Sequence, residues 1–558
     1  MLLEIIYRHT ELYISYILLF IYFYLLGRSS SIIFSKFLSG KVNLKKQIFL
    51  NKQNIFYPIF GILLSANLLL FINFFIPLES NFVLFIMFLF LLPNLKHINI
   101  DNLFTIQKLC TIQNLFCYVV IPIILLVSTY DILFHYDAGY YHLNNQNWIR
   151  ESNLIIGMVN IFWASGMSSL YEYVSAVLWF DSIFIYLHFL NLIFIHFLYI
   201  FITKNIFNNN NKELRNISIL MLLFSFLDNF GLGGGRNGFI YIQGVGKQDT
   251  TLAILFFLTC TFIFIYIKKR KISEIDLLYL SILTFSIIAI KLSGVVVFIF
   301  YLFFIIFIAK EKIISFKNII FIHFPVILFG LFWTLKTFLM TGCFIFPLNV
   351  TCKNSFDWYV QNSTESYELI SKASSLNYEW GSSFTIWVEK FTDYEFYMNV
   401  LTNFLISILI FSILKRIMFT AEDNKQKIIS LFFIIANIFY LIFFGPIPRY
   451  AMGFMMVSIS LIGLFTCELK INISKNFRYI FIFISIILLV RINSYNSFFS
   501  YSDFSLFDPR VEAKYVQSNQ DWVIPDVGDQ CWINLNCSMA RDDVFIDDSS
   551  FFKVAYKN

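Results

Sequence analysis

Charged residues are scarce in this sequence. Only 14% of its 558 residues are Asp, Glu, Lys or Arg, against about a quarter in soluble domains, whereas 58% are apolar and 20% are aromatic. A chain with so little charge does not fit an ordinary soluble protein. Its net charge of +6 comes largely from clusters in short loops between apolar runs, so it reports membrane topology, and we expect no nucleic-acid binding.

Patterns for zinc, nucleotide and export-signal recognition are also missing. The cysteines lack the Cys-x2-Cys spacing and nearby His that zinc needs, so we assign no metal ligand. The glycine-rich stretch 231–246 lacks the GxxxxGK[ST] order of a phosphate-binding loop. Glu4, Arg8 and Glu11 precede or open the first apolar run, so we expect no cleavable signal peptide.

Apolar runs fill most of the chain. Many approach the roughly 20 residues that a helix needs to cross the hydrocarbon of a bilayer. Because the runs are continuous and do not alternate with polar residues, they predict helices and not a barrel. We therefore predict an all-α polytopic membrane protein with about 14 transmembrane helices. The predicted spans are 11–27, 56–76, 82–95, 114–131, 183–203, 216–230, 251–267, 276–290, 295–309, 318–335, 401–414, 428–444, 451–467 and 479–491.

Basic residues fall in alternate loops of this plan. Loop 28–55 carries Lys and Arg but no acid, and further basic clusters, such as the run at 268–271, fall on the same side. Positively charged loops stay in the cytoplasm, so both termini are predicted to face outward. The larger outward segments are then 132–182, 228–250, 336–400 and 492–558.

Five regions follow from these spans, and we expect the last of them to fold over the outward face. They are an N-terminal three-span extension (1–113), a seven-span core (114–335), a large outward loop (336–400), a four-span bundle (401–491) and an extracytoplasmic tail (492–558).

Four of the eight cysteines lie in predicted outward segments, where an oxidising exterior lets disulfides persist. Local pairing joins Cys343 with Cys352 and Cys531 with Cys537. We favour these disulfides over free thiols.

A polar cluster, FHYDAGYYHL at 134–143, follows the fourth predicted span at the outer surface. On a helical continuation Asp137 and Tyr141 share a face, and His135 and His142 flank them. A carboxylate here can act as a general base toward a hydroxyl group. The histidines and the aspartate could also surround a divalent cation, although this spacing is a weak metal signal. The bland alternative, which the residues alone favour, is that the cluster caps and anchors a helix in an aromatic belt.

Residues 154–181 are apolar but are interrupted by Gly, Asn, Ser and Glu. This composition predicts one or two helices that lie in the membrane interface. Counting the segment as a crossing would also place the basic run at 268–271 outside, against the positive-inside rule. The predicted local order is thus a span (114–131), an outward acidic motif (134–143), one or two interfacial helices (154–181) and a further span (183–203).

That order resembles the GT-C fold of membrane glycosyltransferases over about residues 114–335. The resemblance implies that Asp137 is the catalytic base or its electrostatic partner, and that the donor is a polyprenyl-phosphate-linked sugar. Many members carry a paired acidic motif at this place, whereas this chain has a single Asp137 with Asp131 six residues earlier. Because of this departure, the resemblance does not decide whether the site uses a divalent cation, and we assign no cofactor.

Four segments together also resemble a little-characterised family of bacterial polytopic proteins, named after a locus tag and found with envelope polysaccharide genes. They are YDAGYYHLNNQNWI (136–149), LKTFLMTGCFIFPLNVTC (335–352), GPIPRYAMG (445–453) and VGDQCWINLNC (527–537). The resemblance implies a location in the bacterial inner membrane and a role connected with envelope polysaccharides. One segment, SGMSSL at 165–170, departs from the family's R-x-G-F-N-S-like pattern, so no phosphate role is transferred there.

A departing phosphate needs a cation, and both Arg and Lys serve this purpose. For each outward cation the alternative is ordinary anchoring at the interface. We favour Arg449. The outward candidates are Arg236, Lys247, Lys291, Lys336 and Arg449.

We expect a membrane glycosyltransferase whose site faces the periplasm or exterior, with a glycan or a lipid-linked oligosaccharide as acceptor and membrane lipid around it. Tyr141 and His142 are expected to help bind the substrate. The tryptophans of the large outward loop, Trp358, Trp380 and Trp387, suit sugar rings, although ordinary packing is as good an explanation. A repeat-unit polymerase is the alternative, and transport is disfavoured because the spans are nearly free of charge.

Overall fold

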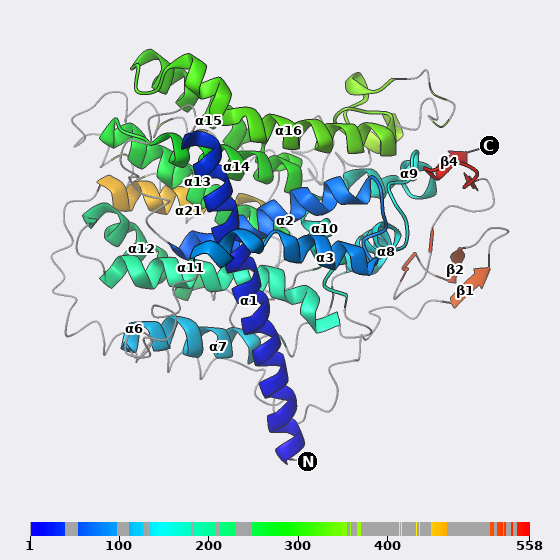
Figure 1. Ribbon diagram of the computed structural model, residues 1–558, viewed down its shortest axis with the longest axis horizontal. Helices are drawn as coiled ribbons and strands as arrows, with labels where there is room; N and C mark the ends of the chain where they lie inside the picture. The colour runs from blue at the N-terminus through cyan, green and yellow to red at the C-terminus, as the bar shows by residue number, and fades with distance from the viewer. Residues whose placement is uncertain are drawn as a thin grey trace, which may run out of the picture.

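We describe a computed structural model of the chain, which is mostly helical (Figure 1). The structure describes residues 2–39, 54–97, 111–127, 136–179, 184–207, 211–228, 248–353, 365–369, 448–465, 514–517, 522–527, 529–531, 537–538 and 544–557, with the single positions 129, 134, 245, 356, 358, 412, 415, 431 and 435.

Six helices within these residues are long and apolar enough to cross a membrane, and they indicate a multi-pass membrane protein. These are Ile6–Leu38, Asn54–Asn73, Ile185–Phe207, Asp249–Lys269, Leu292–Lys310 and Phe316–Thr341. Shorter apolar helices cover Asn81–Asn94, Gln113–Val127 and Met452–Phe465. The predicted number of about 14 spans is not shown; the predicted spans 401–414, 428–444 and 479–491 lie almost wholly outside the described residues.

The helices are bounded as follows. The α-helices are α1 Leu2–Ser39, α2 Tyr57–Asn73, α3 Asn81–Leu89, α6 Ile112–Leu115, α7 Ile121–Val127, α8 Leu143–Glu151, α9 Met158–Ile161, α10 Leu170–Ala176, α11 Phe189–Phe207, α12 Lys212–Asp228, α13 Asp249–Lys269, α14 Glu274–Ile290, α15 Val295–Lys310, α16 Phe316–Thr341 and α21 Pro448–Phe465. Short 3-10 helices are η1 Asn54–Phe56, η2 Leu92–His97, η5 Trp163–Met167, η6 Phe184–His188, η7 Leu292–Gly294 and η8 Asn349–Thr351, and η3 Phe116–Val120 and η4 Ala138–His142 are π-helices.

Burial separates the central helices from the peripheral ones. Helices α11 and α13 are apolar on every side and almost wholly buried, which is the pattern of helices at the centre of a bundle. Helices α15 and α16 are equally apolar but keep many large side chains exposed, as expected of faces that meet lipid.

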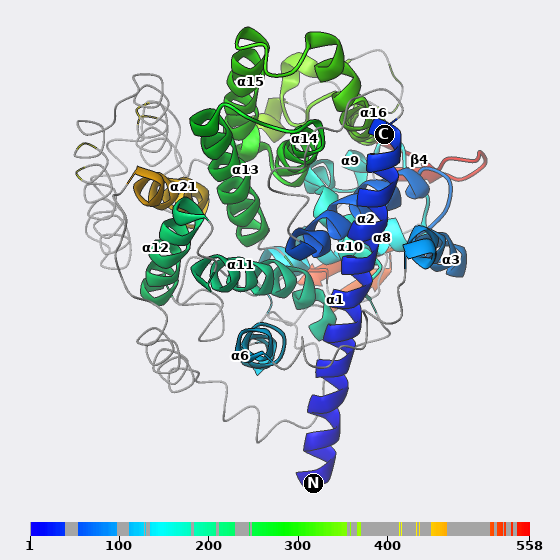
Figure 2. The ribbon, with the colours of Figure 1, turned by 60° about the vertical axis from the view of Figure 1, so that its left-hand side comes forward.

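Helix α1 runs upright across the other helices in both views and packs against α2 (Figures 1 and 2). Two glycines make the close approach possible. A Cβ atom on Gly27 would lie 1.8 Å from the carbonyl oxygen of Tyr57, and one on Gly61 would lie 1.9 Å from that of Phe23. The two backbones therefore touch where neither helix carries a side chain.

Short helices and the C-terminal strands gather at one end of the molecule. Helices α8 and α9 lie at the right of Figure 1 with strand β4, and α8, α9 and α10 are all far shorter than a membrane crossing. Strand β1 (Lys514–Gln517) pairs antiparallel with β2 (Val523–Val527), and β3 (Val544–Asp547) pairs antiparallel with β4 (Val554–Lys557). These hairpins add short strands to a chain that we predicted to be all-α.

Contacts between loops respect the two sides that the charge pattern assigns. At the predicted inner side, Lys268 and Lys269 form ion pairs with Glu213 at 3.0 and 3.3 Å. At the predicted outer side, Lys291 pairs with Asp249 at 2.5 Å. Each of these pairs joins loops that the charge pattern predicts to lie on the same side, and the orientation itself stays a prediction.

Candidate functional site

The polar cluster forms a widened helical turn at the start of α8. Asp137 is the residue before the π-helix η4, and the N–H of Leu143 donates to the carbonyl of Ala138, five residues back. Insertions of this kind occur often at functional sites. The sequence predicted a regular helical turn here, and the wider one keeps Asp137, Tyr141 and His142 within a single turn.

Burial differs along that turn. Asp137 and Tyr141 are partly exposed, whereas His142 is buried. The ring of Tyr141 lies against that of His142, with centroids 3.9 Å apart. Asp137 is thus the carboxylate of this turn that solvent or a substrate can approach, and His135 lies outside the described residues.

Glu172 on α10 joins this turn to the interfacial helices. Its carboxylate accepts hydrogen bonds from Nδ1 of His142, from Nδ2 of Asn145 at 2.5 Å and from the backbone N–H of Ser169 at 3.3 Å. The side chain of Ser169 caps the same helix start, so Ser169 and Glu172 form a capping box. Because Nδ1 of His142 faces a carboxylate, Nδ1 is assigned as the donor of this hydrogen bond.

A buried cation, Lys336 near the end of α16, contacts the segment just before Glu172. Its side chain is 1% exposed, and its ammonium donates to the carbonyl of Ser168 at 2.9 Å. It also interacts electrostatically with Glu172. A buried charge is costly unless it is compensated, so Lys336 and Glu172 are best understood as one charged unit.

Arg150, at the end of α8, serves as an anchor. Its guanidinium donates to the carbonyls of Ala176 and Trp179 at 3.3 and 3.2 Å and lies 5.0 Å from the centre of the Trp179 ring. It also pairs with Glu79 at 3.7 Å. Burial lowers the pKa of Arg150 from its ordinary value, but guanidinium stays charged at any physiological pH.

The C-terminal tail packs on the turn that carries Asp137. The hydroxyl of Tyr136 donates to the carboxylate of Asp529, and the N–H of Cys531 donates to the carbonyl of Gly139 at 2.6 Å. Burial and the bond to Asp529 together raise the pKa of Tyr136 to about 12. Cys531 is bonded to Cys537, and a second disulfide joins Cys343 to Cys352.

Further tail contacts lie on the loop that follows α8. Ser538 donates to the carbonyl of Ile161 at 2.6 Å, and Ile156 forms a β-bridge with Val554 of β4. Asn160 donates to the carbonyls of Ala555 and Trp358 at 2.8 and 2.7 Å. The tail thus packs on the loop between α8 and α10, and the predicted outward orientation of both stays a prediction.

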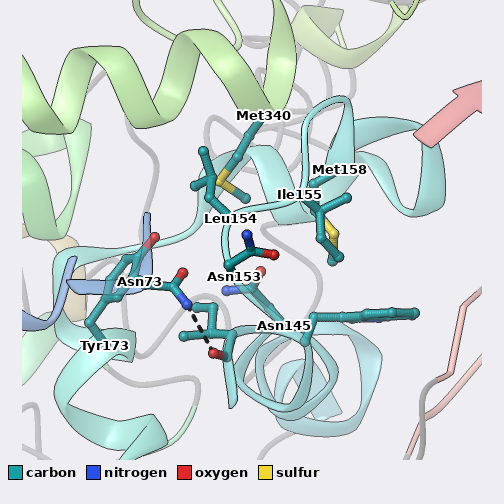
Figure 3. A pocket seen from close by; sticks show the side chains of 10 residues that line it. Asn73, Asn145, Asn153, Leu154, Ile155, Met158, Tyr173 and Met340 are labelled. Carbon is teal, nitrogen blue, oxygen red and sulfur yellow. Dashed lines mark hydrogen bonds between the residues drawn. The ribbon is translucent and has the colours of Figure 1, made fainter. Parts of the chain in front are cut away.

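A pocket opens between α8, the loop after it and α16 (Figure 3). It has about 260 Å³ of empty space, including the part open to solvent. Asn145 rises into it from below in this view, and Met340 reaches down from above. Its lining is Asn73, Asn145, Trp148, Ile149, Asn153, Leu154, Ile155, Met158, Tyr173 and Met340.

The other predicted cations are not brought to this place by the described residues. Arg236 and Lys247 lie outside those residues. Arg449 is in the first turn of α21, which packs on α12 and α13 and lies away from α8 in both ribbon views (Figures 1 and 2); its side chain is not described. Lys291 forms an ion pair with Asp249. Among the predicted tryptophans Trp380 and Trp387 are outside the described residues.

Sequence reasoning missed Glu172 and Asn145. The signal for Glu172 was present, because Ser169-x-x-Glu172 is the pattern of a capping box, but such a box predicts a helix start and not a partner for His142. Asn145 lies in a polar stretch whose four consecutive amides, residues 144–147, are all buried. Within the part of the chain that is described, no group of three or more His, Cys, Asp or Glu residues could hold a metal ion.

Comparison with known proteins gives one match. Residues 12–456 match the model of a family described as "Domain of unknown function (DUF8201)". Nothing among curated proteins or solved structures matches the chain.

Proposed function

Because the chain belongs to the DUF8201 family, whose description names no reaction, we propose its function from its own outward loop. The proposal is a membrane glycosyltransferase that moves a sugar from a polyprenyl-phosphate carrier to an envelope glycan, such as an O-antigen or capsule, on the outer face of the bacterial inner membrane. The observation that carries it is the partly exposed Asp137 on a widened turn, held beside a buried His142–Glu172 pair.

Asp137 is the carboxylate suited to the role of base. Glu172 is buried and its oxygens already accept three hydrogen bonds, so a substrate hydroxyl has little access to them. Asp137 would take the proton of an acceptor hydroxyl as that oxygen bonds to the anomeric carbon. The bond between this carbon and the carrier phosphate breaks, and the phosphate leaves with the electron pair.

The leaving phosphate carries negative charge that a cation would stabilise. Lys336 is near enough to Glu172 to act on the same region, but it is buried and would act through its field and not by contact. Arg236, which lies outside the described residues, remains the proposed residue for direct contact, since Arg binds phosphate oxygens in pairs, whereas α21 places Arg449 away from α8.

Two observations support an outward-facing site. Both disulfides lie in segments that the basic-loop pattern places outside, and disulfides persist in oxidising compartments. The tail that covers Gly139 is held by one of them. A site in this position can meet a carrier lipid at the membrane surface and a glycan from the exterior.

The test replaces Asp137 with Asn and compares envelope glycans from a deletion strain that carries either the natural or the altered gene. The asparagine keeps the size of the side chain and removes the base, so we expect the added sugar to disappear from the glycan. Asp548→Asn is the matched control, because Asp548 is an exposed aspartate near the chain end. Unchanged glycan from normally expressed Asp137→Asn would refute the role of Asp137.

The same glycan preparation separates the two enzymatic alternatives. Loss of a side-branch transferase leaves long chains with an altered composition. Loss of a repeat-unit polymerase leaves single repeat units instead. We expect long chains.

A further inference from the structure

A small loop closed by a disulfide follows the end of α16. It covers residues 343–352, with Cys343 bonded to Cys352, and we call it the disulfide loop. Four of its apolar side chains are exposed, and a set of this size in so short a segment marks a contact surface. They are Phe344 (43%), Ile345 (36%), Leu348 (40%) and Val350 (91%).

One apolar side chain of the disulfide loop turns inward and fixes the loop to the protein. Phe346 is buried and packs with Val159 and Cys343. Its ring lies so close to η5 that a Cβ atom on Gly166 would be 2.8 Å from it. The loop is thus held at its ends by the disulfide and in its middle by Phe346, and this fixed backbone presents the other four apolar side chains outward.

The backbone N–H groups of the disulfide loop are largely paired within the protein. The hydroxyl of Thr351 accepts from the N–H of Ile345 at 3.1 Å and donates to the carbonyl of Leu348 at 2.8 Å. The N–H of Asn349 donates to the carboxylate of Glu368 at 2.9 Å. Backbone that approaches hydrocarbon needs such pairing, because lipid tails offer no hydrogen-bond partner. The N–H groups that donate to carbonyls of the loop itself are those of Phe344, Leu348, Thr351 and Cys352.

The exposed side of the disulfide loop continues the exposed apolar stripe of α16. Leu331 and Leu335 are exposed on the last turns of this helix, and their spacing puts them on one face with Phe338. The ring of Phe338 stacks on that of Phe344, with centroids 4.8 Å apart. The surface that meets lipid along the helix therefore runs through Phe338 onto the loop.

The length of α16 indicates the level at which the loop lies. Its 26 residues span about 39 Å, against roughly 30 Å of hydrocarbon and about 40–45 Å of bilayer with the headgroups. A helix of this length ends in the headgroup layer. Phe356 and Trp358 stack on each other beside Phe338, and tryptophan is typical of this layer.

We propose that the disulfide loop is a membrane anchor whose exposed apolar side chains enter the headgroup layer of the bilayer at this end of α16. Apolar side chains at this depth stabilise the contact in proportion to the apolar area that they bury. Phe346 joins the anchor to η5, which precedes the helix that carries Glu172, so the anchor sets the level of that segment relative to the lipid headgroups. The inference names bilayer lipid as the partner and does not depend on the proposed reaction.

The test measures whether lipid or water surrounds position 350. Val350 is replaced by a genetically encoded coumarin amino acid in the full-length protein, which is placed in nanodiscs of phosphatidylethanolamine and phosphatidylglycerol. One quencher is a lipid with a nitroxide near its headgroup, and the other is iodide in the water. Val516 is the matched control position, because it is an exposed valine on β1, which lies apart from α16 in Figure 1.

We expect the nitroxide lipid to quench the coumarin at position 350 about threefold more strongly than at position 516, and iodide to show the reverse order. Equal quenching of the two positions by the nitroxide lipid overturns the proposal. Protection of position 350 from both quenchers would show that another protein surface covers the loop, and this result overturns the proposal as well.

Leu348→Asp then tests the cause of the insertion. A carboxylate resists entry into the bilayer, so quenching of position 350 by the nitroxide lipid should fall about threefold while quenching by iodide rises. Phe545→Asp is the matched control, because Phe545 is exposed on β3 in the tail, and it should leave both values unchanged. Unchanged quenching in Leu348→Asp protein that melts like the unaltered protein contradicts the anchor, and the comparison of positions 350 and 516 stands without this variant.

Discussion

Glu172 holds three separate pieces of the outward loop through one carboxylate. It accepts from His142 on the widened turn, from Asn145 on α8 and from the backbone at the start of its own helix. All of these groups are buried. The geometry of the candidate site therefore depends on a residue that we do not assign to the chemistry.

Replacing Glu172 with Ala should destabilise the protein strongly. The change removes a helix cap and leaves buried donors of His142 and Asn145 without an acceptor, each at a cost of about 1–3 kcal/mol. We expect a total loss of about 3 kcal/mol or more in the free energy of unfolding, seen as a lower melting temperature in detergent. Glu151→Ala is the control, because Glu151 is exposed, and it should change stability by about 0.5 kcal/mol or less. Equal melting of the two variants would contradict this account of Glu172.

Tyr136 gives the tail contact a pH dependence. Its pKa in the folded protein is raised to about 12, by burial first and by its bond to Asp529 second. In the unfolded chain the pKa is about 10, so the neutral phenol favours folding below pH 10, and this contribution is lost as the pH rises from about 10 to about 12. Tyr136 is partly exposed, so solvent screening keeps the effect small.

The check compares Tyr136→Phe with the unaltered protein. The gap in melting temperature between them should be steady from pH 7 to 9 and should narrow above about pH 10, where the natural protein loses its tail bond. A gap that is constant up to about pH 12 means that the hydroxyl does not hold Asp529.

Single residues could be singled out where the signal was local. The turn around Asp137 and His142 drew attention because polar residues stand out in an apolar chain, and its role as a site stays a prediction. The partner of His142 was not, since Glu172 lies 30 residues away and sequence periodicity says nothing about contacts at that distance. The roles of Arg236 and Arg449 stay predictions.

At the scale of elements, the crossing of α1 and α2 depends on two glycines. A Cβ atom at Gly61 would lie 1.9 Å from the carbonyl oxygen of Phe23, a distance at which a backbone must move. Gly61→Ala should therefore separate α1 from α2 and lower the melting temperature in detergent by several degrees.

Gly330 on α16 provides the matched control for this change. A Cβ atom there would meet only Phe285, at 3.8 Å, which is ordinary contact. Gly330→Ala should leave stability equal or slightly higher, because alanine has the better helix propensity. If Gly61→Ala melts like Gly330→Ala, the close crossing is not formed.

Long apolar helices were predicted well, and irregular elements were not. The run 251–267 became α13 at Asp249–Lys269, because hydrophobic length alone sets such a helix. The π-helix at Ala138–His142 and the strands of the tail were missed. Their stabilisation comes from tertiary partners, such as the bridge between Ile156 and Val554, which a single sequence does not display.

For the whole molecule, the charge pattern predicts two sides of the membrane, and each predicted side contains contacts between loops. The basic run at 268–271 contacts Glu213, and the tail near Lys553 contacts Ser152 of the outward loop at 3.2 Å. The positive-inside rule predicts that the first group lies in the cytoplasm and the second at the exterior.

Cysteine labelling in intact cells tests this assignment. Ser549→Cys, on an exposed turn of the tail, should react with a membrane-impermeant maleimide, whereas Lys271→Cys should react only after the membrane is opened. The unaltered protein, with its own eight cysteines, is labelled in parallel to give the background; of these, Cys117 and Cys260 are free and buried within the described residues. The reverse labelling pattern would contradict the predicted membrane orientation and would place the Asp137 turn in the cytoplasm.

Sugar transfer itself is the central claim, and it can be measured with purified protein in liposomes. The reaction contains a polyprenyl-phosphate carrier loaded with a radiolabelled sugar and envelope glycan from the deletion strain as acceptor. We predict that the natural protein moves label from the lipid to the glycan and that Asp137→Asn, equally folded, moves it at least about a hundredfold more slowly. Label that stays on the carrier with the natural protein, or leaves it equally fast with Asp137→Asn, would contradict the account.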